Sequence, residues 1–103
     1  MIRIFRKGET DLLISGHAGS SLYGHDLICA GVSVLALTLE VNVQALGKAG
    51  KLERSLVRLE PGNTRIRCTP EEGFRAQAVE LFDTVCRGFR LLAGKYPDYV
   101  SYL

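Results

Sequence analysis

The sequence has little of what several protein classes require. Its 103 residues include no tryptophan, one methionine, three prolines and three cysteines. An odd number of widely spaced cysteines, Cys29, Cys68 and Cys86, fits neither a disulfide framework nor a paired-cysteine metal site, so we expect free thiols and no metal. The longest uncharged apolar run, 27–39, has 13 residues, fewer than the roughly 20 that span a membrane. No long apolar segment follows the charged N-terminus, which predicts a cytoplasmic protein.

The residues that are present describe one folded domain. A chain of 103 residues has the length of a single domain, and 47% hydrophobic residues are enough for one continuous core. Thirteen lysines and arginines against eleven acidic residues leave a net charge of +2, which demands no acidic partner. No linker, repeat or low-complexity tract interrupts the chain. We therefore treat residues 1–103 as one domain.

Two apolar segments have the spacing of helices. The first begins after Asp26 as its N-cap and ends near the glycines of 47–50. It is apolar almost all round, so we expect it to be buried. Alternating β-branched residues in 34–43 also suit a strand, although length and caps favour a helix. The second begins with Thr69 as its N-cap, has a proline in its first turn and a glutamate at the capping-box position, and runs to Gly94.

Five shorter segments have the alternation of β-strands. They are 2–5, 12–15, 52–59, 64–68 and 99–103. Between the third and the fourth, Glu60-Pro61-Gly62-Asn63 has proline and glycine where a type II turn requires them, which predicts a hairpin. The element order β-β-α-β-β-α-β predicts an α+β domain with two helices packed on one mainly antiparallel sheet.

His17 and Cys29 are the best candidates for catalysis. His17 follows a predicted strand in a loop rich in glycine and serine, and Cys29 lies in the first turn of the first predicted helix. The unpaired amides and the positive end of the helix dipole stabilise a thiolate there. A nearby imidazole can take the thiol proton, and the helix amides can stabilise an oxyanion. This combination indicates nucleophilic acyl transfer.

Structural interpretations of the two residues remain open at this point. Free cysteines are commonly buried, and a histidine at the end of a strand is often a structural residue. His25 is an alternative base, but it lies only four residues before Cys29, where a solvated or capping role is favoured. Asp26 can orient a histidine, although N-capping already explains it.

Ser33 and three glycines are auxiliary candidates. Ser33 lies one helical turn beyond Cys29 on the same face, which suits either a polar role beside the site or a buried hydroxyl bonded to the preceding turn. Gly16, Gly19 and Gly24 allow substrate backbone to approach or the loop to close, or they only form a turn. We expect Cys68 and Cys86 to lie in the core.

A set of closely spaced motif residues surrounds the two candidates. They are Gly16-His17-Ala18-Gly19, Gly24, Asp26, Cys29-Ala30 and Val32-Ser33, with the histidine and the cysteine 12 positions apart. This set resembles the bacterial ribosomal-processing cysteine protease family (Prp, YsxB-like). The resemblance implies that Cys29 is the nucleophile and His17 the general base, without metal or organic cofactor. It also implies a homodimer and, as substrate, a large-subunit ribosomal protein precursor whose N-terminal extension is removed.

A basic segment around the predicted hairpin offers an alternative function. This segment contains six cationic residues and two glutamates: Lys48, Lys51, Arg54, Arg58, Arg65 and Arg67, with Glu53 and Glu60. The alternative is a non-enzymatic ribosome-associated binding module that uses this hairpin, with Cys29 merely buried. Arginines at alternate strand positions are also typical of a solvated sheet face. No aromatic residue is interleaved, so we expect no contact with nucleic acid and favour the enzyme.

Overall fold

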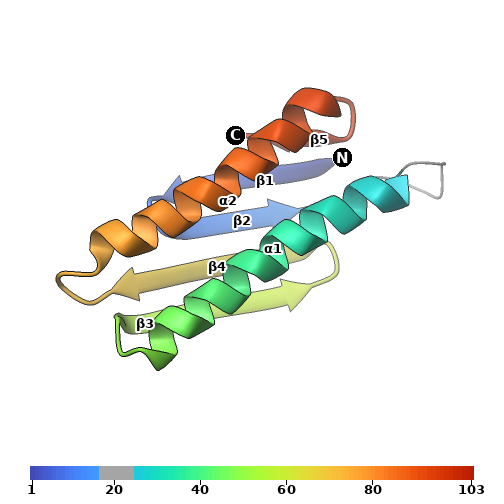
Figure 1. Cartoon of the computed structure of the whole chain (residues 1–103). Helices are drawn as coiled ribbons and strands as arrows, with labels where there is room; N and C mark the ends of the chain where they lie inside the picture. The colour runs from blue at the N-terminus through green and yellow to red at the C-terminus, as the bar shows by residue number, and fades with distance from the viewer. Residues whose placement is uncertain (17–24) are drawn as a thin grey trace.

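The computed structural model describes residues 1–16 and 25–103, and within them it has two helices and a five-stranded sheet (Figure 1). The elements in chain order are β1 (Ile2–Gly8), β2 (Asp11–Ser15), α1 (His25–Lys48), β3 (Leu52–Glu60), β4 (Asn63–Pro70), α2 (Arg75–Lys95) and β5 (Val100–Tyr102). The predicted order β-β-α-β-β-α-β and the α+β class are confirmed.

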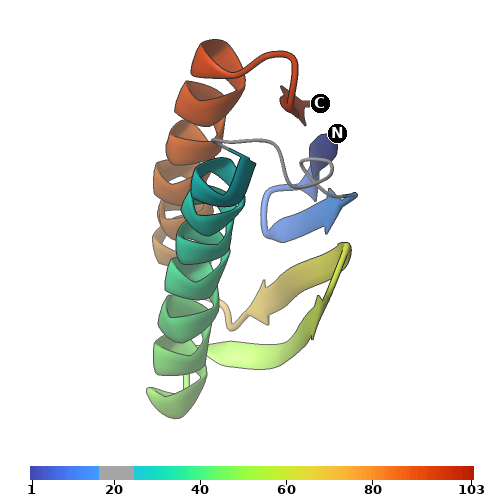
Figure 2. The same ribbon diagram turned by 90° about the vertical axis from the view of Figure 1, so that its right-hand side faces the viewer.

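The strands lie in the order β3-β4-β2-β1-β5. Three of the pairings described are antiparallel, and β1 pairs with β5 in parallel, so the sheet is mixed but mainly antiparallel, as predicted. Both helices cover the same face of the sheet and leave the other face open (Figure 2). The β3–β4 hairpin forms around the predicted turn, where Gly62 has a φ of 73°, the left-handed value that a type II turn needs at this position.

The core lies between the helices and the covered face of the sheet. The buried residues of α1 recur every three or four positions, which is the spacing of one helix face. They are Ile28, Val32, Ala36, Leu39, Val43 and Leu46. From α2, Phe82 and Phe89 are completely buried against the same core. Burial of side chains of this size contributes about 1.5–3 kcal/mol each, so these two phenylalanines anchor α2 to the sheet.

The C-terminal end of α1 is fixed by a Schellman motif. The Gly50 amide donates to the Gly47 carbonyl oxygen and the Lys51 amide donates to the Leu46 carbonyl oxygen, both at 3.0 Å. Gly50 has a φ of 74°, which glycine adopts without steric cost. The prediction that this helix ends in the glycine segment 47–50 is therefore confirmed.

The predicted start of the second helix is wrong. Thr69 and Pro70 lie in β4, because the ladder with β3 continues through both residues and commits their backbone to the sheet. Gly73, with a φ of 92°, then turns the chain, and α2 begins at Arg75. Phe74 is its N-cap and makes no capping hydrogen bond through its side chain. Tertiary strand pairing thus overrides a local capping signal.

The first helix also differs from its prediction at its start and on its surface. It begins at His25, so Asp26 lies within the first turn instead of at the N-cap, and Cys29 is the fifth helical residue. The helix is not buried all round, because Leu27, Val34 and other apolar side chains face outward. By length and composition the segment Leu27–Lys48 would suffice to cross a membrane, a criterion that the core helices of folded proteins also meet.

Candidate active site

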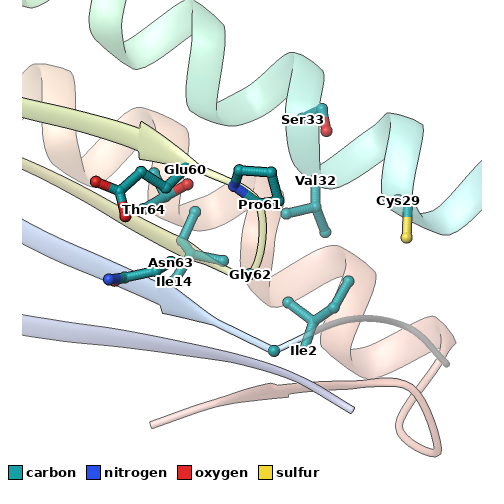
Figure 3. A pocket seen from close by; sticks show the side chains of 11 residues that line it. Ile2, Ile14, Cys29, Val32, Ser33, Glu60, Pro61, Gly62, Asn63 and Thr64 are labelled. Atoms are coloured by element: carbon teal, nitrogen blue, oxygen red, sulfur yellow. The ribbon is translucent and has the colours of Figure 1, made fainter.

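A small cavity of about 250 Å³ borders the N-terminal half of α1 (Figure 3). Cys29, Val32 and Ser33 line it from the helix. Ile2 and Ile14 contribute from β1 and β2, and the turn between β3 and β4 forms a further wall. In Figure 3 the Cys29 sulfur lies on the side of the helix that faces Ile2. Among the described residues, parts of β1, β2, α1 and the β3–β4 turn therefore meet around one thiol.

Helical spacing explains how α1 presents its part of the cavity. Cys29, Val32 and Ser33 follow at i, i+3 and i+4, which places them on one face of the helix. Ile28 is 4% exposed and Val32 is 7% exposed, so the helix is anchored in the core on both sides of the cysteine. Cys29 itself is only partly buried. Cys29 thus packs against the core but is not fully enclosed, as the binding-module alternative expected it to be.

Ser33 stands beside the cysteine as the spacing predicted. It lines the same cavity, and its side chain is exposed. Of the two roles left open for this residue, the buried hydroxyl is excluded. Its role as a polar group beside the thiol, where a hydroxyl can donate to or accept from a bound peptide, stays a prediction.

Gly16 forms the edge of the cavity next to β2. Its φ is 86°, and its amide donates a hydrogen bond to the Gly62 carbonyl oxygen at 3.0 Å. A Cβ atom at this position would collide with the Met1 carbonyl oxygen. Both the backbone conformation and the close approach of the chain therefore require glycine here.

The pairing of His17 with Cys29 stays a prediction. His17, Gly19 and Gly24 lie outside the described residues. Asp26 is described only by its place in the first turn of α1. Their predicted roles stay predictions, and what the described residues establish is the wall of the site that carries Cys29 and Ser33.

The turn between β3 and β4 is a part of the site that sequence reasoning missed. Glu60, Pro61, Gly62 and Asn63 all line the cavity, although the sequence pattern indicated only a hairpin turn. The strand order brings this turn next to α1, and no local sequence pattern predicts that position. Together with the isoleucines of β1 and β2, it gives the cavity an apolar floor and a polar rim, an arrangement typical of ligand sites.

The other two cysteines are core residues, as predicted. Cys68 is 3% exposed and Cys86 is 2% exposed, and all three cysteines are free. Burial raises the pKa of the Cys68 thiol, which opposes formation of a thiolate. Within the described residues no group of three or more histidine, cysteine or acidic side chains is arranged to hold a metal ion. Cys29 is therefore the cysteine whose position suits a nucleophile.

Comparisons with known proteins give a family and a set of related folds. The family model described as cysteine protease Prp matches residues 1–101. The Staphylococcus aureus essential ribosomal processing protease Prp, solved in complex with a substrate peptide, is similar with a TM-score of 0.71 and 21% identity, over 99% of this chain and 95% of that chain. The S. aureus protein with a covalently linked product peptide gives a TM-score of 0.67 and 23% identity, over 98% and 94% of the two chains.

A streptococcal structure extends the comparison. SMU.848 from Streptococcus mutans has a TM-score of 0.67 and 27% identity, over 98% of this chain and 89% of that chain. No curated protein matches. The structures share the fold of this chain over nearly all of its length. Because the family model also covers residues 1–101, the chain belongs to the Prp family of cysteine proteases.

Proposed function

We propose that this cysteine protease acts in the cytoplasm and removes the N-terminal extension of a large-subunit ribosomal protein, with Cys29 as nucleophile and His17 as general base. The observation that carries the proposal is the position of Cys29. It is the partly exposed member of the three cysteines, and it lines a cavity to which α1, β1, β2 and the β3–β4 turn contribute. The S. aureus relative, described as a ribosomal processing protease, supports the choice of substrate.

Chemistry at Cys29 follows the usual course of a thiol protease. His17 accepts the thiol proton, and the Cys29 sulfur attacks the scissile carbonyl carbon. The amide bond breaks, the leaving amine receives the proton from the imidazolium, and a thioester remains on Cys29. Water then attacks the thioester, releases the carboxylate product and returns the thiol. Gly16, the residue before His17, lines the same cavity as Cys29, which supports this pairing.

Two features of α1 assist the reaction. Side chains of a helix lean toward its N-terminus, so the Cys29 side chain leans toward the first turn of α1. The amides of that turn have no carbonyl partner within the helix, and such donors can stabilise the oxyanion that forms on the scissile carbonyl. Ser33, four residues further along the same helix face, adds a hydroxyl beside the cysteine.

The cavity also indicates what kind of side chain the substrate presents. Ile2, Ile14 and Val32 make its floor apolar, and its volume of about 250 Å³ is small. A single apolar side chain of an extended peptide suits this space. The polar groups of the β3–β4 turn at the rim are placed to contact the peptide backbone.

An intact-mass time course with the ribosomal protein precursor tests the proposal. Wild-type enzyme is expected to remove one discrete N-terminal peptide, while Cys29→Ala and His17→Ala leave the precursor intact. Cys86→Ala is the matched control, because it removes a buried thiol outside the cavity and is expected to retain cleavage. A precursor that stays intact with the wild type would contradict the substrate. Cleavage by His17→Ala at the wild-type rate would contradict the role of His17.

We further propose a homodimer that forms through the outward apolar face of α1 and α2. Large apolar side chains are exposed on this face: Leu27, Val34, Leu37 and Val41 on α1 and Leu91 on α2. Between the helices runs an apolar groove of about 640 Å³. Soluble monomers rarely expose a large contiguous apolar patch, and such patches mark protein interfaces.

Analytical ultracentrifugation tests the dimer. The wild type is expected to sediment at twice the monomer mass, and Val34→Glu is expected to shift the protein to the monomer, because it places a charge within the apolar face. Leu103→Glu is the matched control, since Leu103 is 65% exposed and Val34 is 62% exposed, but Leu103 lies outside that face. A wild type at the monomer mass over a wide concentration range would contradict the proposal.

A further inference from the structure

The face of the sheet opposite the helices is open, and its side chains can be assigned from strand alternation (Figure 2). Ile66 is completely buried on the helix side, so Arg65 and Arg67 point to the open side. In β1, Ile2 and Ile4 are buried in the same way, which puts Arg3 and Phe5 on the open side.

The sheet register gathers arginines from separate parts of the chain on this open side. Residues directly opposite each other in neighbouring strands share a face. Arg58 is opposite Arg65, and Arg54 is opposite Thr69, so β3 contributes two arginines beside the two of β4. Together with Arg3 of β1 they form what we call the basic sheet face: Arg3, Arg54, Arg58, Arg65 and Arg67.

Carboxylates neutralise only part of this charge. Asp11 accepts two hydrogen bonds from Arg65, at 2.8 and 3.2 Å. Glu60 lies 3.9 Å from Arg58, at the margin of an ion pair. Among the residues that the structure describes, Arg3, Arg54 and Arg67 make no ion pair, and all three are exposed. The basic sheet face therefore keeps three arginines available for an external anion.

A row of side chains that lie opposite one another crosses the same face. Phe5 of β1 lies opposite Leu13 of β2, Leu13 lies opposite Arg65 of β4, and Arg65 lies opposite Arg58. Phe5 is 44% exposed, so its ring is accessible from the open side. The row thus runs from an aromatic ring to two guanidinium groups.

We propose that the basic sheet face binds single-stranded RNA, with phosphates on Arg3, Arg54 and Arg67 and a base stacked on Phe5. Guanidinium groups match phosphate with two parallel hydrogen bonds, and an accessible ring stacks on any base. An open sheet face with a ring among cations suits unpaired bases better than a duplex. The expectation of no nucleic-acid contact assumed that no aromatic was interleaved. In the folded sheet an aromatic residue does lie beside these arginines, because the register brings Phe5 of β1 into line with the arginines of the hairpin.

Fluorescence anisotropy with a labelled single-stranded RNA of about 12 nucleotides tests the proposal. The triple variant Arg3→Ala, Arg54→Ala and Arg67→Ala is expected to bind at least about tenfold more weakly. It is also expected to reduce the slope of log affinity against log salt by about 2, since each phosphate contact contributes roughly 0.7 for single strands. Arg87→Ala is the matched control, because this exposed arginine lies on α2 and not on the sheet.

Phe5→Leu separates stacking from charge. This variant is expected to weaken binding by about tenfold and to leave the salt slope unchanged, because stacking on the ring involves no counterion release. Absence of RNA binding by the wild type, or equal binding by the triple variant and Arg87→Ala, would overturn the proposal. Competition by polyglutamate as strong as by unlabelled RNA would also overturn it, in favour of an acidic protein partner. No peptidase step enters the assay, so its result is independent of the proposed cleavage.

Discussion

The Gly16 amide and the Gly62 carbonyl oxygen are joined by a hydrogen bond of 3.0 Å. This bond connects the end of β2 to the turn between β3 and β4, and both glycines line the cavity that contains Cys29. Both also have a positive φ, 86° at Gly16 and 73° at Gly62. The wall of the cavity opposite α1 therefore depends on two left-handed backbone conformations held by one hydrogen bond.

Gly16→Ala is expected to destabilise the protein by about 1–3 kcal/mol, because a left-handed alanine is strained and its Cβ would collide with the Met1 carbonyl oxygen. Urea unfolding measures the difference. Gly94→Ala is the matched control, since nothing lies within 4 Å of a Cβ at this helical position. It is expected to stabilise the protein by about 0.5–1 kcal/mol. Equal stability of Gly16→Ala and the wild type would contradict the strain.

Iodoacetamide is expected to modify Cys29 alone in the folded protein. Cys68 and Cys86 are almost completely buried, so their labelling requires opening of the core. With a stability of several kcal/mol, we expect labelling of these two to be slower by about 10³-fold or more. Mass spectrometry after digestion gives the sites, and unfolding in urea should expose all three thiols. Rapid modification of Cys86 in the native protein would show that the core around α2 is more open than described.

Tyr102→Phe is expected to reduce the loss of stability at alkaline pH. Burial raises the pKa of the Tyr102 phenol, the nearby Cys86 thiol adds to the rise, and Arg90 and Arg6 oppose it. Since the folded pKa lies above the unfolded value of about 10, the contribution is complete below that pH and is lost as the pH rises through the folded pKa. The measurement is the unfolding free energy of the wild type and of Tyr102→Phe between roughly pH 8 and pH 11. The two curves should diverge only above about pH 10, the unfolded pKa of a phenol.

Asp83→Ala is expected to cost about 1–3 kcal/mol. Asp83 accepts a hydrogen bond of 2.6 Å from Arg6, which ties α2 to β1, and the Arg6 side chain is only 17% exposed. Loss of the carboxylate leaves a partly buried guanidinium without its charged partner. Glu80→Ala breaks the exposed pair with Arg87, 3.6 Å apart, and is expected to cost less than about 1 kcal/mol. Equal effects of the two substitutions in urea unfolding would contradict this ranking.

Much of the fold follows from local signals in the sequence. The β3–β4 hairpin is predicted by one turn sequence, and the end of α1 is predicted by its glycines, because both depend on backbone conformations of a few neighbouring residues. The predicted start of α2 is wrong for the opposite reason. Thr69 carries a local capping signal, but pairing with β3 decides its conformation, and that pairing is a long-range effect.

The candidate site divides in the same way. Cys29 and Ser33 could be placed together because helical spacing fixes their relation. The turn at 60–63 reaches the cavity only through the strand order, which no local pattern reports. The exposed face of α1 was missed because an almost wholly apolar helix does not reveal from its composition which side meets the sheet.

The parallel pairing of β1 with β5 sets a time at which the cavity is completed during synthesis. Ile2 lines the cavity, pairs with Val100, and donates its amide to the Tyr99 carbonyl oxygen at 2.8 Å. A nascent chain therefore carries Cys29 well before the strand that holds Ile2 in place has been made. We therefore expect the cavity around Cys29 to stay incomplete until residues 99–103 have been synthesised, and with it the cleavage that we propose for this site.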